Sequence, residues 1–198
     1  MPVFNTTELL KKLTVDVQQI MKTTENIRGL DSAILNRQPA TGKWSVAQVV
    51  EHLNSYNRYY LPEMEKALND GIAKRMLFVP RFKSGWFGNY FTNMMLPKAD
   101  GKIANKMNAP TDHVPAADLD AEKVIAEFVA GQQKMLQLLQ ASAKTDIGKL
   151  KVPISISRFI KLKLGDTFRF VIAHQKRHFV QLAKTLDAVQ NDRAKAVA

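Results

Sequence analysis

Four long stretches of the chain repeat apolar residues with the period of about 3.6 residues that is typical of an α-helix, a pattern that leaves few folds open. It predicts helices over about residues 6–27, 45–64, 120–142 and 165–189. One stripe of the first stretch carries Leu9, Leu13, Val17, Ile20 and Met21. Each such helix has an apolar face that must be buried, and four of these faces can cover one another in a bundle. We therefore predict an all-α four-helix bundle.

The start of the second helix has a clearer signal than its end. Ser45 is followed three residues later by Gln48. This is the spacing of a capping box, in which each side chain accepts a hydrogen bond from the other residue's backbone N–H. Pro62 lacks the amide hydrogen that a helix interior needs. We therefore expect this helix to kink at Pro62 or to end just before it.

The connections between the helices are long. Residues 72–117 join the second helix to the third with weaker periodicity, and a connection of this length usually has a function or holds short elements of its own. The segment KVPISISRFIKLKL, residues 151–164, contains β-branched residues but has no convincing partner strand. No repeat or shift in composition divides the chain. We predict one domain over residues 1–198, a four-helix bundle with long crossover connections.

The composition excludes several classes of site. The chain has no cysteine, which excludes disulfides, thiolate metal sites and a cysteine nucleophile, and leaves His, Asp and Glu as side-chain metal ligands. The N-terminus does not resemble a signal peptide, and no run approaches the roughly 20 apolar residues of a membrane span. We expect a cytoplasmic protein. The chain has a net charge of +11, but its sequence contains no known nucleic-acid-binding motif. We therefore expect a basic but ordinary surface.

Two of the four histidines lie one helical turn apart. His174 and His178 share a helix face with Phe170 and Leu182, the face that a bundle buries. Buried imidazoles need polar partners, and one metal ion can serve both. His52, on the inward face of the second helix, is the natural third ligand. The alternatives are a structural pair at positions 174 and 178, and a core histidine at 52 whose ring bonds a backbone carbonyl.

Other catalytic arrangements find less support. His113 lies in a loop-like stretch and is expected at the surface. The H-E-x-x-H motif of helical zinc proteases is absent, and Glu51 points about 100° away from His52 around the helix. Ser45 and His52 could join an acid in a catalytic triad only on paper, because no nucleophile elbow accompanies them.

Two segments, one toward each end of the domain, together resemble a known family. GKWSVAQVVEHL, residues 42–53, and GDTFRFVIAHQKRHFVQL, residues 165–182, are together similar to the DinB-like superfamily of four-helix-bundle proteins. The resemblance implies a divalent metal, zinc or nickel among others, held by one histidine of the second helix and two of the fourth. By position these are His52, His174 and His178. Some similar bundles are thiol-dependent transferases or isomerases that use bacillithiol or mycothiol.

A site of three neutral histidines leaves coordination positions for water or substrate, as in catalytic metal sites. Two reactions follow. The ion could activate water for hydrolysis of a small molecule, or bind a low-molecular-weight thiol as thiolate for transfer to an electrophile. Candidate supporting residues around such a site are Gln48, Tyr56, Tyr60, Trp86 and Gln181.

The basic aromatic segment from Lys74 to Lys98 allows a different class of function. It contains five basic residues, no acidic residue and six aromatic residues. We expect the aromatic residues of 78–91, Trp86 among them, to cover the metal pocket, because apolar rings are costly to leave in water. The alternative is a non-catalytic protein that binds nucleic acid or a membrane surface through this segment. A homodimer is also possible.

Overall fold

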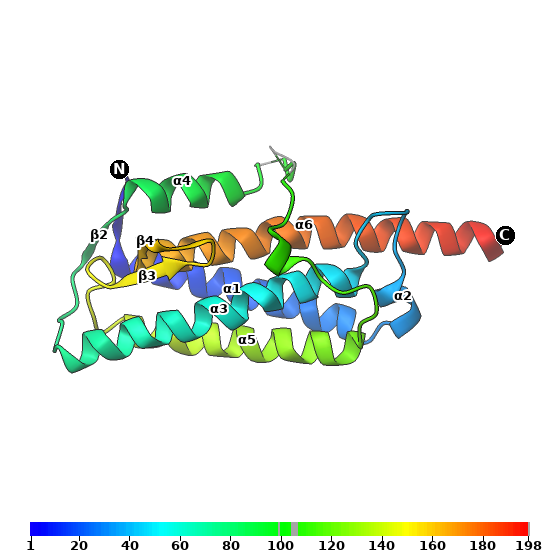
Figure 1. Ribbon diagram of the computed structural model, residues 1–198. Coiled ribbons are helices and arrows are strands. Elements are labelled where there is room, and N and C mark those ends of the chain that lie inside the picture. Colours follow the sequence, from blue (N-terminus) through cyan, green and yellow to red (C-terminus); the bar gives the residue numbers. More distant parts are fainter. Residues whose placement is uncertain (99, 104–106, 198) are drawn as a thin grey trace.

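The computed structural model describes residues 1–98, 100–103 and 107–197, and four long helices dominate it (Figure 1). These helices are α1 (Thr6–Arg28), α3 (Val46–Ala73), α5 (Ala121–Ser142) and α6 (Leu164–Val197). Their buried faces contribute to one apolar core, as the periodicity predicts. The all-α four-helix bundle is confirmed. Residues 99 and 104–106 of the predicted 72–117 connection, and residue 198, lie outside the described residues.

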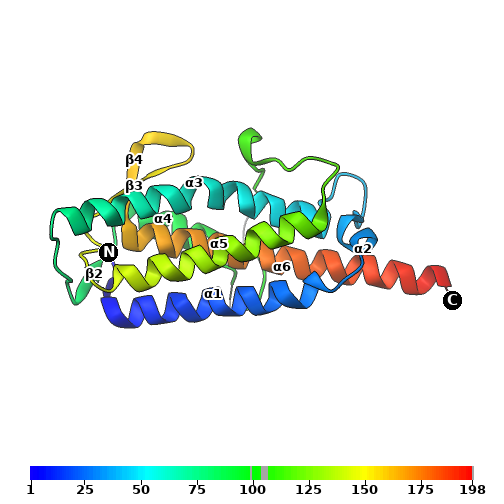
Figure 2. The same ribbon diagram turned by 90° about the horizontal axis from the view of Figure 1, so that it is seen from below.

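The order of the helices explains the length of the crossover. α1 and α6 run in one direction and α3 and α5 in the other (Figures 1 and 2). α1 and α3 each pack against both α5 and α6. Because α3 and α5 are parallel, the chain must return along the bundle between the end of one and the start of the other. In the described part of the chain, no helix is both long and apolar enough to cross a membrane.

Short elements fill the connections. The α1–α3 connection contains α2 (Ser32–Asn36). The crossover from α3 to α5 contains β2 (Arg81–Lys83), α4 (Trp86–Met95) and the 3-10 helix η1 (Thr111–His113). β2 pairs antiparallel with β1 (Val3–Asn5), which places Phe4 opposite Phe82. The crossover therefore holds elements of its own, as its length suggests.

A buried polar cluster ties α4 to α6. The fully buried carboxylate of Asp166 accepts hydrogen bonds from Gly85 N at 2.7 Å, from Ser84 Oγ, and from Arg169 Nη1 at 3.0 Å. The approach of the two helices is close, because a Cβ added to Gly88 would lie 2.3 Å from Asp166 Cγ. α4 is therefore fixed on α6 at its N-terminal end.

The segment before α6 forms a hairpin, which the sequence analysis missed. β3 (Lys151–Ile154) pairs antiparallel with β4 (Ser157–Lys163), with Val152 opposite Leu162. The expectation of no partner strand was wrong, because the two halves of the segment pair with each other. Val152, Ile154 and Leu162 are buried in the main core, and this burial stabilises a hairpin whose connecting residues, Ser155 and Ile156, carry no strong turn signal.

Pro62 does not end the second long helix. α3 continues through it to Ala73. Of the two expectations, a kink at Pro62 or an end just before it, the end of the helix was wrong. Proline removes one backbone hydrogen bond, but Leu61 and Met64 on either side of it are buried, as is Leu68 further on, and tertiary packing of this kind outweighs local propensity. The predicted start is confirmed: Ser45 Oγ accepts from Gln48 N at 3.2 Å, and Gln48 Oε1 accepts from Ser45 N at 3.0 Å.

Candidate metal centre

The bundle brings His52 of α3 together with His174 and His178 of α6. One ring nitrogen from each histidine lies within 4.8 Å of the others. The ring centroids are 4.6 Å apart for His52 and His178, 4.5 Å for His174 and His178, and 5.2 Å for His52 and His174. His52 and His174 are buried and His178 is partly buried. The predicted convergence of these three residues is therefore present.

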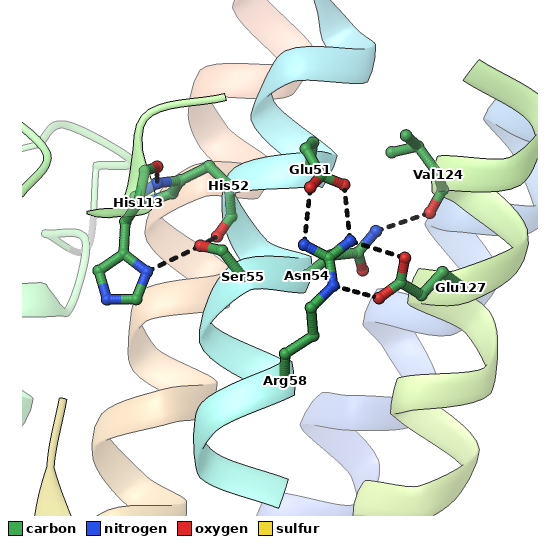
Figure 3. A network of polar contacts seen from close by, with 8 residues as sticks. All are labelled: Glu51, His52, Asn54, Ser55, Arg58, His113, Val124 and Glu127. Atoms are coloured by element: carbon green, nitrogen blue, oxygen red, sulfur yellow. Dashed lines mark hydrogen bonds and ion pairs between the residues drawn. The ribbon is translucent and has the colours of Figure 1, made fainter. Parts of the chain in front are cut away.

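The backbone of the crossover orients His52. Nδ1 of His52 lies 2.7 Å from the carbonyl oxygen of His113. Because a carbonyl only accepts, Nδ1 carries the proton and Nε2 of a neutral ring presents its lone pair. A return contact strengthens this link: Ser55 Oγ lies 2.8 Å from His113 Nδ1 and donates to the His52 carbonyl at 2.7 Å (Figure 3). His113 thus clamps the crossover to α3.

Gln181 orients the second ring. The amide oxygen of Gln181 lies 2.9 Å from Nδ1 of His178. An oxygen acceptor at Nδ1 leaves Nε2 of His178 with its lone pair, the arrangement that supports a metal-binding imidazole. Gln181, a candidate supporting residue from the sequence, therefore lies in hydrogen-bond contact with His178. For His174, Nδ1 is buried and has no hydrogen-bond partner among the described residues.

The donor geometry suits a small divalent ion. Nε2 of His52 and Nε2 of His174 are 3.3 Å apart. Metal–nitrogen bonds of about 2.0–2.1 Å in a tetrahedral arrangement place two ligand nitrogens roughly 3.3–3.4 Å apart. Neutral imidazoles are also ligands that zinc and nickel accept readily. By distance and by donor chemistry, the three histidines could hold a metal ion.

Burial keeps the three rings neutral. Desolvation lowers the pKa of His52, and it lowers the pKa of His174 well below its usual value, with His178 and His52 as the next largest causes. The pKa of His178 falls to about 3, mainly through burial and then through its proximity to His52. A neutral imidazole is the form that binds a metal. The site is therefore in a ligand-ready state at neutral pH.

The histidines form part of the wall of a cavity of about 510 Å³, a volume in the usual range for small-molecule sites. The cavity wall also includes the C-terminal part of α4 with Phe91, Met94 and Met95, the crossover from Met107 to Pro110, and the hairpin residues 154–156. Segments far apart in the sequence therefore enclose one space beside the three histidines.

Tyr56 and Tyr60 both line this cavity, as predicted for residues near the site. Tyr56 stacks on His113 with ring centroids 4.0 Å apart, and its ring lies 4.3 Å from that of His174. Burial, followed by the proximity of Tyr60, raises the pKa of Tyr56 to about 12. The Tyr60 hydroxyl accepts from Ser155 N at 3.1 Å. Tyr56 is therefore a protonated phenol that can donate to a ligand, while Tyr60 also holds the hairpin.

Gln48 and Trp86 lie elsewhere than expected. Gln48 completes the cap of α3 and donates to the Ala116 carbonyl at 3.0 Å, so its hydrogen bonds hold the crossover against the start of α3. Trp86 is 60% exposed and does not line the cavity. Six aromatic residues were predicted to cover the pocket. In the described part of the chain, Phe91 is the one of these six that lines the cavity. The reason is that these residues lie on opposite faces of α4. Phe91 and Met95 face the cavity, and Trp86 and Tyr90 face outward.

Sequence reasoning missed three residues around the site. Trp44 lies with its ring centroid 5.0 Å from that of His52. Arg177 lines the cavity from α6 and is 7% exposed. Its position three residues after His174, on a neighbouring strip of the same helix, is a signal that could have identified it. His113 was expected at the surface and is buried, which was wrong. No sequence signal marks it, because its contact with His52 is through the backbone.

Glu51 stays outside the site, as its position on the helix predicted. Arg58 bonds Glu51 at 2.8 Å and Glu127 of α5 at 2.7 Å (Figure 3). These hydrogen bonds raise the pKa of Arg58, and they link α3 to α5 on the face away from the histidines. In the described lining of the cavity there is no Asp or Glu.

Comparison with known proteins agrees with this architecture. A family model described as the DinB superfamily matches residues 16–182, a range that includes all three histidines. The chain is also 21% identical over 170 residues to a protein of Bacillus subtilis (strain 168) named uncharacterized protein YuaE, an alignment that covers 86% of this chain and 94% of that protein. No solved structure matches significantly. With most of its length matched by the family model, the chain belongs to the DinB superfamily.

Proposed function

We propose that the protein is a divalent-metal enzyme, with zinc or nickel on His52, His174 and His178, that transfers a small thiol to an electrophile. The observation that carries this proposal is the convergence of three neutral imidazoles beside a cavity of about 510 Å³. A structural metal site is closed by protein ligands, whereas three ligands beside a cavity leave a position for a small molecule.

The lining favours thiol transfer over hydrolysis. Metal-dependent hydrolases of the H-E-x-x-H type use a glutamate as general base, and the described lining of this cavity contains no carboxylate. A divalent ion here would act as a Lewis acid that lowers the pKa of a bound thiol, so that its sulfur is anionic near neutral pH. The chain has no cysteine, so the thiol must come from a cosubstrate such as bacillithiol or mycothiol.

Tyr56 has a defined part in this reaction. Its phenol is protonated near neutral pH because burial raises its pKa to about 12. It can therefore donate a hydrogen bond to negative charge that develops on the electrophile or its leaving group. The largely apolar walls around it lower the local dielectric constant, which strengthens that hydrogen bond. Tyr56 is thus a donor in the proposed reaction and does not serve as its base.

Thiol conjugation tests the proposal. Untagged protein loaded with Zn²⁺ or Ni²⁺ is mixed with bacillithiol, mycothiol or coenzyme A and the fluorogenic electrophile monochlorobimane. We expect metal-dependent conjugation that EDTA abolishes, and a decrease in kcat of about 10- to 100-fold in Tyr56→Phe with unchanged metal content by elemental analysis. Metal-loaded protein that hydrolyses esters and conjugates none of the thiols would contradict thiol transfer. Protein that binds neither ion would contradict the metal centre itself.

A second candidate function has one observation in its favour. The outer face of α4 exposes Trp86, Phe87 and Tyr90, at 60%, 48% and 52%, and the segment 74–98 around it contains no acidic residue. We propose that this α4 face is an interaction surface for a partner with negative charge. Retention on heparin or on anionic lipid vesicles, lost at high salt and in Trp86→Ala, would support it. A change from dimer to monomer in Trp86→Ala would instead identify the face as a homodimer contact.

A further inference from the structure

The cavity beside the metal centre has a one-sided charge. Its described lining contains two cationic side chains, Lys43 and Arg177, and no Asp or Glu. The three histidines contribute no negative charge, and a divalent ion among them would add positive charge. A cavity lined in this way repels cations and attracts anions.

Arg177 is the charged residue set deeper in this wall. It lies on α6 between the two histidines and is 7% exposed, whereas Lys43 is exposed. The planar donors of Arg177 match carboxylate, sulfonate and phosphate groups, which can accept two parallel hydrogen bonds. The position of Arg177 therefore suits an anionic group that enters the cavity.

Most of the remaining lining is apolar and adaptable. The side chains around the cavity mouth and walls include three methionines and three large aromatic residues: Met94, Met95, Met107, Trp44, Phe91 and Phe170. Methionine side chains are flexible and polarisable, and they contact aromatic rings favourably. This lining suits a flat apolar body better than a strongly hydrated molecule such as a sugar.

We infer that the cavity binds a small molecule with an apolar, aromatic-sized body and one anionic group, and that Arg177 binds the anionic group. Lys43 at the exposed edge attracts the same charge. The inference rests on the proposed function only where it names this molecule as the electrophilic substrate. Binding itself requires the cavity and its arginine, and it does not require turnover.

Two matched dyes test this inference. 1-Anilinonaphthalene-8-sulfonate has an apolar body and one anionic group, and N-phenyl-1-naphthylamine has the same rings without the sulfonate. We expect the folded protein to bind the sulfonate at least about 10-fold more tightly than the neutral dye. Arg177→Met should weaken sulfonate binding about 10-fold or more, the usual loss for a hydrogen bond to a charged group, and leave binding of the neutral dye unchanged.

Two further variants locate the dye. Ala109→Trp fills the cavity from the crossover and should abolish binding of both dyes. Lys66→Met removes one exposed positive charge of α3 away from the cavity and should change neither affinity. If Arg177→Met does not fold, as judged by circular dichroism and melting, Arg177→Gln and Arg177→Lys take its place, with loss of sulfonate preference expected only in the glutamine variant.

The inference is overturned if both dyes bind equally well and Arg177→Met changes neither affinity. It is also overturned if Ala109→Trp leaves sulfonate binding intact, because the dye would then lie elsewhere, as on the exposed α4 face. Elemental analysis on the same samples keeps the proposed function separate. Protein that takes up neither Zn²⁺ nor Ni²⁺ but prefers the sulfonate would contradict the metal enzyme and support the anion site. Protein that takes up either ion but shows no preference for the sulfonate would contradict the anion site alone.

Discussion

Replacing His174 by alanine is expected to reduce the affinity for Zn²⁺ or Ni²⁺ by more than about 100-fold, since even the loss of a residue that supports a ligand costs 10- to 100-fold. The variant removes one of three donors and leaves the other two from different helices. The wild-type protein should gain about 2.7 kcal/mol at a free metal concentration 100 times its Kd. This gain corresponds to a rise of roughly 5–10 °C in Tm for a chain of this size, and His174→Ala should lose it.

His113→Ala is the matched control for this experiment. It also removes a buried imidazole near His52, with ring centroids 6.4 Å apart, compared with 5.2 Å for His174 and 4.6 Å for His178. The variant keeps the backbone carbonyl that orients His52, so metal affinity should stay within about 10-fold of wild type. Competition with a chromogenic chelator measures the affinities, and thermal melts with and without EDTA measure the Tm gain. Equal affinities for wild type and His174→Ala would rule out the proposed ligand set.

The metal-free protein is expected to lose stability steeply as the pH falls below about 6.5. The folded state holds the pKa values of His52, His174 and His178 below the usual 6.5, that of His178 at about 3. Because the unfolded chain then binds more protons, their contribution to stability is complete above pH 6.5 and is lost as the pH falls toward 3. Each histidine contributes a slope of up to about 1.4 kcal/mol per pH unit.

Urea unfolding at several pH values measures this dependence in EDTA-treated protein. A variant with glutamine at all three positions should show a flatter profile between pH 6.5 and 4, because the three imidazoles of the cluster are gone. Any remaining slope in this window would come in part from His113, whose pKa burial also lowers. A wild-type profile as flat as that of the glutamine variant would mean that the three rings are not buried as a neutral cluster.

The parts of the structure that sequence could predict depend on regular helices. Residues four apart on one face identify His174 and His178 as neighbours, and the apolar stripe around His52 turns it toward them. Burial confirms that reasoning, since His52 is 2% exposed and His174 3%. The same periodicity predicts the four long helices, and the spacing of Ser45 and Gln48 predicts the capping box. Each of these features depends on contacts within a few residues.

Features that depend on distant contacts were not predictable in this way. Trp86 and Phe91 both lie on α4, but only a known helix direction shows that one faces solvent and the other the cavity. His113 has its role through a carbonyl group, which every residue possesses. The hairpin of residues 151–163 lacks a turn motif, and the helix through Pro62 persists because α3 is buried on both sides of it.

The contact between His52 and the backbone of His113 has a consequence for how this site can change over generations of mutation. The acceptor is a main-chain oxygen at 2.7 Å, so an amino-acid replacement at position 113 leaves it in place provided that the 3-10 turn of residues 111–113 is kept. The crossover also supplies part of the cavity wall, including Met107 and Pro110. Replacements in that wall can therefore change which molecules the cavity admits, while the main-chain contact continues to orient His52.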